Sequence, residues 1–149
     1  MTEYKRITRR DMLSDIARVV SRRSTCPRKS VGAIIVREGR VLSMGYNGTP
    51  SGLPHCHDVG CLVGPDGGCT RAQHAEANAI AFAARHGIAT NGAELWTTLS
   101  PCPSCAKLII NAGITDVYFM EQYRLREGLD LLVSAKVSIF LVAINEQKP

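Results

Sequence analysis

Two short stretches, HAE at residues 74–76 and PCPSC at residues 101–105, determine how the rest of this chain is organised. One imidazole and two thiols can hold Zn²⁺ through three protein ligands and leave a fourth position open, which distinguishes a catalytic zinc from a structural one. The carboxylate of Glu76 follows the histidine by two residues and is available to carry protons. The two stretches therefore predict one metal centre, with His74, Cys102 and Cys105 as ligands and Glu76 as the catalytic residue.

Each stretch opens a predicted helix. Ala-rich sequence with apolar residues at helical spacing predicts a helix over 74–86, which Gly87 ends. His74 and Glu76 point about 200° apart around that helix, so they share a target only beyond its N-terminal end. Cys102 and Cys105 lie on one face of the first turn of a helix over 103–112. We expect the two helix starts to face each other across the metal and to lower both thiol pKa values.

The combined pattern H-x-E…P-C-x-x-C is typical of zinc-dependent nucleobase deaminases. Zinc held by two thiolates is a weaker Lewis acid than zinc held by three imidazoles, so the attacking water needs a proton acceptor. We expect Glu76 to take that proton, to pass it to ring N3 and to protonate the leaving amine after attack at C4. A C-x-x-C before a helix is also typical of thioredoxin-like redox pairs, but that alternative leaves His74 and Glu76 unexplained.

Composition predicts one globular domain over residues 1–149, with 45% hydrophobic and 21% charged residues. The chain has no apolar run of membrane-spanning length, and its first residues do not resemble a signal peptide, so we expect a cytoplasmic protein without a membrane partner. In that reducing compartment the six cysteines are expected to be metal ligands and not disulfides. The net charge of +5 suits an anionic small ligand or a nucleic acid.

The periodicity of the chain predicts an α/β fold with a three-layer α/β/α sandwich and a five-stranded mixed sheet. The expected helices cover 8–23, 74–86, 103–112 and 124–134, and the expected strands 31–36, 40–45, 93–98, 116–120 and 137–144. The first two strands form a hairpin that turns at Glu38-Gly39. A long loop over 46–71 needs a function or a stabilising link. The first helix is expected to turn Met12, Ile16, Val19 and Val20 inward.

With these motifs in place, the chain resembles a deoxycytidylate (dCMP) deaminase of the cytidine deaminase superfamily, of the bacterial or phage kind. The resemblance rests on CPRK (26–29), VGA (31–33), GYNGTPSG (45–52), HC (55–56), CTR (69–71), HAEANAI (74–80) and PCPSC (101–105). It implies the five-stranded fold, a homohexamer, and hydrolysis of dCMP to dUMP and ammonia for dTTP synthesis. It also implies activation by dCTP and inhibition by dTTP.

The resemblance also assigns residues of the nucleotide site. It implies that Asn47 hydrogen-bonds the deoxyribose, that the backbone at Ala75 holds the base edge, and that the Ser100 carbonyl accepts from the reacting amino group. Tyr123 is expected near the phosphate. From the residues alone, Asn47 is also a turn former after a strand, and Tyr123 is also a half-buried core residue.

Three basic residues are candidates for a phosphate or an effector. Arg28 and Lys29 lie on the loop that enters the first strand, which borders the active site in this superfamily. Arg85 matches an arginine that relatives use for nucleotide contact, but it is also a favourable charge near a helix C-terminus. A triphosphate effector would bring Mg²⁺ to bridge its oxygens.

The remaining cysteines predict a second, structural zinc, because a closed tetrahedral site takes four ligands. They are Cys26, Cys56, Cys61 and Cys69. His55 or His57 could replace one sulfur, and four free thiols are the alternative.

Two other functions remain open from the sequence. One is a dual dCMP/dCTP deaminase or a deaminase of free (deoxy)cytidine, which differs only in its phosphate contacts. The other is a zinc-stabilised nucleic-acid-binding module. Such a module needs aromatic stacking positions, yet aromatic residues make up 5% of the chain, so no nucleic-acid partner is expected.

Overall fold

A five-stranded sheet forms the middle layer of the computed structural model, which describes residues 5–143. β1 (Gly32–Arg37) pairs antiparallel with β2 (Arg40–Tyr46) and, along its other edge, with β3 (Glu94–Leu99). β4 (Asp116–Glu121) and β5 (Ser138–Leu141) continue the sheet in parallel beyond β3. The order β2-β1-β3-β4-β5 confirms the predicted mixed sheet.

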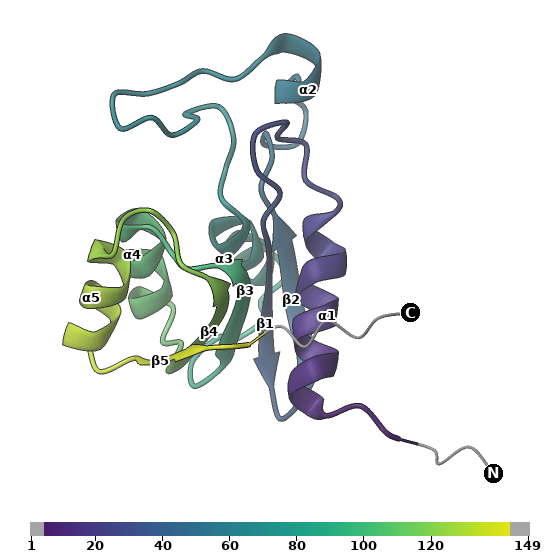
Figure 1. Cartoon of the computed structure of the whole chain (residues 1–149), viewed down its shortest axis with the longest axis vertical. Helices are drawn as coiled ribbons and strands as arrows, with labels where there is room; N and C mark the ends of the chain where they lie inside the picture. Colours follow the sequence, from purple (N-terminus) through teal and green to yellow (C-terminus); the bar gives the residue numbers. More distant parts are fainter. Residues whose placement is uncertain (1–4, 144–149) are drawn as a thin grey trace.

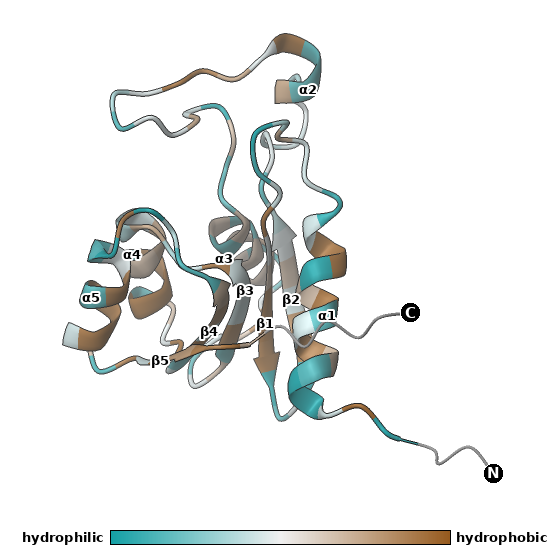
Figure 2. Ribbon diagram, viewed as in Figure 1, coloured by the Kyte–Doolittle hydropathy of each residue, from teal (hydrophilic) through white to brown (hydrophobic). Residues whose placement is uncertain are grey.

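The hairpin turns where the sequence predicted. Glu38 and Gly39 both have positive φ values, 50° and 73°, which suit the tight turn of a two-residue hairpin loop. β1 is buried along nearly its whole length because it lies in the interior of the sheet with both faces covered. In Figure 2, β1 is brown along most of its length, whereas the first turn of the N-terminal helix is teal.

Helices cover both faces of the sheet (Figure 1). α1 (Arg9–Ser21) packs on one face, where its apolar residues share a cluster with Ile34, Val36 and Trp96. α3 (Ala75–Arg85), α4 (Pro103–Asn111) and α5 (Glu127–Ser134) pack on the other face around Ile35, Leu95 and Val117. Neighbouring residues of a strand point to opposite faces of the sheet, so β1 contributes side chains to both clusters. This is the predicted three-layer α/β/α sandwich.

The inward face of α1 differs from the prediction. Leu13, Ala17 and Val20 are buried, whereas Val19 is 60% exposed and Met12 is 36% exposed. The helix lies so close to the sheet that a Cβ on Gly32 would overlap the backbone of α1 at Ala17. Small Ala17 permits this approach. The prediction that Met12 and Val19 point inward was therefore wrong, because it relied on the size of their apolar side chains.

The predicted long loop is present and carries the short helix α2 (Cys56–Val59), which lies away from the sheet in Figure 1. The last predicted strand reaches only Leu141, and Ile144 lies outside the described residues. Within residues 5–143, none of the helices combines the length and the apolar character that crossing a membrane would require.

Candidate active site and metal centre

The two metal-ligand stretches meet at the starts of two helices. His74 is the N-cap residue of α3, Cys102 is the N-cap residue of α4, and Cys105 lies in the first turn of α4. His74 Nδ1 lies 3.4 Å from Cys102 Sγ and 3.5 Å from Cys105 Sγ. All three ligand atoms lie within 4.8 Å of one another. The helix starts therefore face each other in the way that the sequence predicted.

These separations fit a zinc ion. Zinc bonds of about 2.3 Å to sulfur and about 2.1 Å to nitrogen, at tetrahedral angles, place a sulfur and a nitrogen about 3.6 Å apart. The observed sulfur–nitrogen distances of 3.4 and 3.5 Å agree with this value. One imidazole and two thiols are also a donor set that zinc prefers. His74, Cys102 and Cys105 can therefore hold the ion and leave its fourth position open.

The protonation of the two thiols is unequal. The Cys105 thiol and the His74 ring both hydrogen-bond the Cys102 sulfur, and together they lower the pKa of Cys102 to about 4. Cys105 has a raised pKa because of its hydrogen bond to Cys102 and because it is buried. When no cation lies between the sulfurs, the pKa of Cys102 is therefore lowered and that of Cys105 is raised, because adjacent thiolates repel. A divalent cation between the sulfurs would relieve that repulsion.

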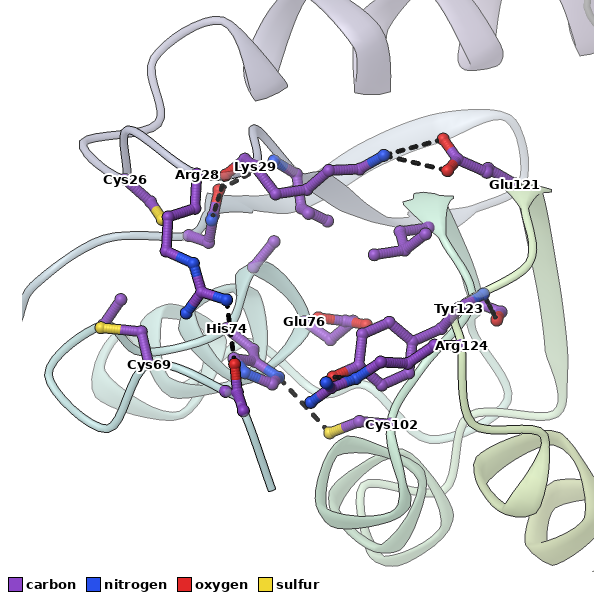
Figure 3. A pocket seen from close by; sticks show the side chains of 18 of the residues that line it. Cys26, Arg28, Lys29, Cys69, His74, Glu76, Cys102, Glu121, Tyr123 and Arg124 are labelled. Carbon is purple, nitrogen blue, oxygen red and sulfur yellow. Dashed lines mark hydrogen bonds and ion pairs between the residues drawn. The ribbon is translucent and has the colours of Figure 1, made fainter. Parts of the chain in front are cut away.

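Glu76 lies buried in the first turn of α3 with 4% of its surface exposed. Burial raises the pKa of this carboxyl group above its usual value. Glu76 lines the same cavity as His74 and Cys102 (Figure 3). A carboxyl group with a raised pKa in a cleft can both accept and donate a proton near neutral pH.

Two glycines allow the helix starts to reach these positions. A Cβ on Gly45 in β2 would overlap the Ala75 carbonyl oxygen, so the first turn of α3 lies directly on the strand. A Cβ on Gly128 in α5 would overlap the Pro101 carbonyl oxygen and would lie 2.9 Å from the Cys102 carbonyl carbon. The backbone that carries Cys102 is therefore packed against α5.

A cavity of about 370 Å³ opens above the metal-ligand cluster. Its walls include the four residues that the family resemblance assigned to the nucleotide, namely Asn47, Ala75, Ser100 and Tyr123, together with the basic candidates Arg28 and Lys29. Arg85 is the exception: it is exposed at the last residue of α3 and does not line this cavity. The volume is in the range of ordinary small-molecule sites, which begin at about 300 Å³.

Asn47 and Ser100 fix the cavity walls by hydrogen bonds to backbone. Asn47 Oδ1 accepts from the Val31 N–H at 2.8 Å, and its Nδ2 donates to the Lys29 carbonyl at 2.7 Å. One N–H of the Asn47 amide remains for a ligand. Ser100 Oγ accepts from the Tyr123 N–H at 2.7 Å. Both interpretations of Asn47 that the sequence left open, a turn former after a strand and a ligand contact, are therefore compatible with its geometry.

Some residues at the rim of the cavity were not predicted from the sequence. Glu121, Gln122 and Arg124 line the cavity, and so do Gly67 and Gly68 from the long loop. Glu121 is the last residue of β4, and Gln122 and Arg124 follow it, so all three lie at the carboxyl end of a parallel strand, where ligands commonly bind in α/β sheets. That rule could have found them. The loop glycines gave no comparable signal.

A second sulfur cluster lies on the long loop. The sulfurs of Cys56, Cys61 and Cys69 lie within 4.8 Å of one another, and Cys56 Sγ lies 3.8 Å from Cys69 Sγ. Two sulfurs on a tetrahedral zinc are about 3.8 Å apart. Burial and the neighbouring thiols raise the pKa of Cys61 to about 12. Backbone N–H groups outweigh burial at Cys69 and lower its pKa to about 7.

Cys26 lies outside this three-cysteine group, so the structure brings three of the four predicted ligands together. It lies on the loop after α1, where its N–H donates to Ser24 Oγ, and it lines the main cavity together with Cys69. His55 and His57 are exposed at α2 and are not part of the group either. The loop thus supplies three candidate ligands, and the cavity wall carries the remaining cysteine nearby.

The H-x-E and P-C-x-x-C segments form a single cluster in one cavity, which places the protein in the class of zinc-dependent nucleobase deaminases. The sequence model of the cytidine and deoxycytidylate deaminase zinc-binding region matches residues 8–121. The chain belongs to this family.

Named relatives agree with this assignment. ComE operon protein 2 of Bacillus subtilis is 46% identical over 125 residues, which cover 83% of this chain and 66% of that protein. The deoxycytidylate deaminase of Enterobacteria phage T2 is 32% identical, covering 85% of this chain and 88% of the phage protein. The dCMP deaminase of cyanophage S-TIM5, solved in complex with dCMP and dUMP, is 35% identical with a TM-score of 0.81, covering 93% of this chain and all of that one.

Proposed function

We propose that this protein hydrolyses dCMP to dUMP and ammonia. The observation that carries the proposal is the buried Glu76 beside the His74–Cys102–Cys105 cluster, at the base of a cavity with cationic side chains at its rim. The S-TIM5 structure in complex with dCMP and dUMP, and the phage T2 deoxycytidylate deaminase, support this choice of substrate.

In the proposed reaction, water adds at C4 of the pyrimidine, N3 gains a proton, the C4–N bond breaks, and ammonia leaves. Zn²⁺ held by His74, Cys102 and Cys105 would supply the Lewis-acid chemistry that makes water nucleophilic. Glu76 takes one proton from the attacking water and delivers it to N3, and it then takes the second proton from the new C4 hydroxyl group and delivers it to the leaving amino group. Its raised pKa suits both directions of transfer.

The cavity walls orient the base and the sugar. Ala75 is the first residue of α3, where backbone N–H groups have no acceptor within the helix, so it can hold the base edge. The Ser100 carbonyl accepts a hydrogen bond from the amino group of the base. The Ser100 hydroxyl oxygen holds this segment in place by accepting from the Tyr123 N–H. The remaining N–H of Asn47 binds the deoxyribose hydroxyl, and Tyr123 lies by the phosphate.

Glu76→Gln tests the proposal most directly. The variant keeps the shape of the side chain and loses the proton carrier, so we expect unchanged zinc content and a fall in dCMP turnover of about 10²–10⁴-fold or more. Glu121→Gln, the same change at an exposed acid on the same cavity, is the control and should keep its kcat. Absorbance assays of dCMP, deoxycytidine, cytidine, dCTP and a cytosine oligonucleotide identify the substrate. More than a tenth of wild-type turnover in Glu76→Gln would refute the assigned role.

The alternative function is deamination of both dCMP and dCTP, or of free (deoxy)cytidine. The cations Arg28 and Arg124 at the rim favour a phosphorylated substrate over a nucleoside. Faster turnover of dCTP than of dCMP in the same assay would favour the triphosphate instead.

We further propose a structural zinc on Cys56, Cys61 and Cys69 with Cys26 as the fourth ligand, and a cytoplasmic homohexamer. Free thiols at all six cysteines suit a reducing compartment.

We propose that dCTP activates and dTTP inhibits, with Mg²⁺ bridging the triphosphate and Arg85 as a contact. An exposed arginine outside the cavity is suited to an effector because it does not compete with substrate. In this proposal the product dUMP supplies dTTP synthesis.

A further inference from the structure

Arg124 follows Tyr123 at the cavity rim, and its guanidinium is held although the residue is exposed. Arg124 Nε donates to the Tyr123 hydroxyl at 3.2 Å, and the guanidinium carbon lies 5.4 Å from the centre of the Tyr123 ring. A second guanidinium nitrogen donates to the Asp66 carbonyl. These contacts fix the plane of the guanidinium at the mouth of the cavity.

The Asp66 carbonyl belongs to a tight turn over residues 64–68. The Gly64 N–H donates to the Gly68 carbonyl at 2.8 Å, and the Gly67 N–H donates to the Gly64 carbonyl at 2.9 Å. Gly67 has a φ of 77°, and a Cβ there would lie 2.9 Å from Arg124 Nη1. Glycine at 67 thus permits both the turn and the close approach of the arginine.

Arg28 holds the same turn by the neighbouring carbonyl. Arg28 Nη2 donates to the Gly67 carbonyl oxygen at 3.0 Å. Figure 3 shows Arg28 and Arg124 approaching from opposite sides, with His74 and Glu76 between them in this view. Two arginines from distant parts of the chain therefore converge on consecutive carbonyls above the metal-ligand cluster.

The positive charge at this mouth resides on the two arginines and not on Lys29. Lys29 Nζ lies 2.9 and 3.0 Å from the two carboxylate oxygens of Glu121, so its charge is largely compensated. Among residues 5–143, neither Arg28 nor Arg124 forms an ion pair. Their hydrogen bonds go to neutral oxygens, which are weaker acceptors than a phosphate.

We propose that Arg124 is a specificity-determining residue that selects a 5′-phosphorylated nucleoside, binding the phosphate jointly with Arg28 beneath the turn 64–68. The inference rests on the proposed function and adds the residue that separates nucleotide from nucleoside. A planar guanidinium can bind two phosphate oxygens at once, and the Tyr123 hydroxyl orients it for this. A charged phosphate is a stronger acceptor than a carbonyl oxygen. The guanidinium N–H groups of Arg28 and Arg124 that donate to the turn would therefore donate to the phosphate when it binds.

The experiment compares kcat and KM for dCMP and deoxycytidine in the wild type, Arg124→Ala and Arg126→Ala. Arg126 is the matched control, since it is an exposed arginine two residues away that pairs with Asp130 and does not line the cavity. We expect Arg124→Ala to lower kcat/KM for dCMP about 30-fold more than for deoxycytidine, mainly through KM, as one charge-assisted contact predicts. Arg126→Ala should leave the ratio of the two substrates unchanged.

A second measurement separates binding from turnover. Calorimetry of dUMP and deoxyuridine on the zinc-loaded enzymes should show that Arg124→Ala loses affinity for dUMP alone. Arg124→Lys should recover part of it, because the charge remains while the fork of donors is lost. Inorganic phosphate should compete with dUMP on the wild type and compete less on Arg124→Ala.

Two failures are distinguishable. Preference of the wild type for deoxycytidine over dCMP would overturn the proposed function, and this inference with it. If the wild type prefers dCMP but Arg124→Ala lowers kcat/KM equally for both substrates, only the role of Arg124 is overturned. Arg124 would then be a structural residue of the rim.

Discussion

His74 Nδ1 lies 3.4 Å from Cys102 Sγ, although 28 residues separate the two positions in the chain. Each residue occupies the N-cap position of a helix, and both helices pack on the same face of the sheet through the core that contains Ala79 and Ile109. The metal centre therefore depends on the packing of two helices against β-strands and not on any local loop. Changes to the ligands and changes to the packing should consequently have different effects.

Cys102→Ser or Cys105→Ser should remove the metal from the active centre and leave the chain folded. Each variant retains only one thiolate beside His74, and a serine hydroxyl is a poor zinc ligand. Elemental analysis should show one zinc fewer per chain than in the wild type, with circular dichroism unchanged. Ser104→Ala, between the two ligands, is the control and should keep full metal content. Wild-type zinc content in both cysteine variants would show that these sulfurs are not ligands.

Acid should release this metal. When no metal is bound, hydrogen bonds to Cys102 raise the pKa values of both Cys105 and His74. Protons therefore compete with zinc for these two ligands. The sign follows directly: as pH falls, both groups bind protons more readily and zinc affinity falls. Titration with a chromogenic chelator from about pH 8 to pH 5 should show progressive zinc release. Affinity that stays constant over this range would contradict the assigned donor set.

Gly128→Ala should disturb the metal centre from a distance. The added Cβ would overlap the Pro101 carbonyl, and a backbone atom cannot swing aside as a flexible side chain does. Overpacking of this kind costs about 1–3 kcal/mol of unfolding free energy. Because the displaced segment carries Cys102, zinc retention should fall as well. Glu127→Ala, an exposed neighbour on α5, should change neither by as much. Unchanged melting temperature and zinc content would contradict the tight contact.

The sequence predicted the strands, the helix starts and the cluster because each leaves a local signal. Alternating apolar residues identify strands, and Pro103 identifies the first residue of α4. The inward face of α1 has no such signal, because the close approach of Gly32 makes small Ala17 the central contact in place of larger apolar neighbours. Only the packed structure decides which side of that helix is buried.

The rim of the cavity was harder to predict for a similar reason. Arg124 reaches its place through a hydrogen bond to the Asp66 carbonyl, 58 residues away, and carbonyls leave no pattern in a sequence. The sequence made Lys29 a phosphate candidate but gave no sign of its pairing with Glu121, 92 residues away. Pairings between distant loops set the charge of the site, and one chain's sequence does not record them.

The second metal site is tested by graded losses. We expect two zinc ions per wild-type chain and the loss of one in Cys61→Ser, because Cys61 belongs to the three-sulfur group. Cys26→Ser should weaken retention without abolishing it, since Cys26 lies outside that group and the other three sulfurs remain. Both variants should lower the stability of the loop to proteolysis more than they lower kcat. One zinc per wild-type chain, unchanged in Cys61→Ser, would rule out the site.

Regulation is expected to act through α3. This helix begins directly after His74, carries Glu76 in its first turn and ends at the exposed Arg85, so a rigid movement at one end changes the position of groups at the other. An effector shifts activity only by binding one conformational state better than another, and the subunit interfaces of the proposed hexamer would provide such states.

We therefore predict a sigmoidal dependence of rate on dCMP that becomes hyperbolic when dCTP and Mg²⁺ are added. Arg85→Glu should abolish the response to dCTP, because it replaces attraction for the triphosphate by repulsion, and should keep the turnover at saturating dCMP, because Arg85 does not line the cavity. Lys107→Glu, the same reversal at an exposed position on α4, is the control and should keep the response. Hyperbolic kinetics that neither dCTP nor dTTP alters would show that the switch is absent. Rapid turnover of dCTP itself would make the triphosphate a substrate.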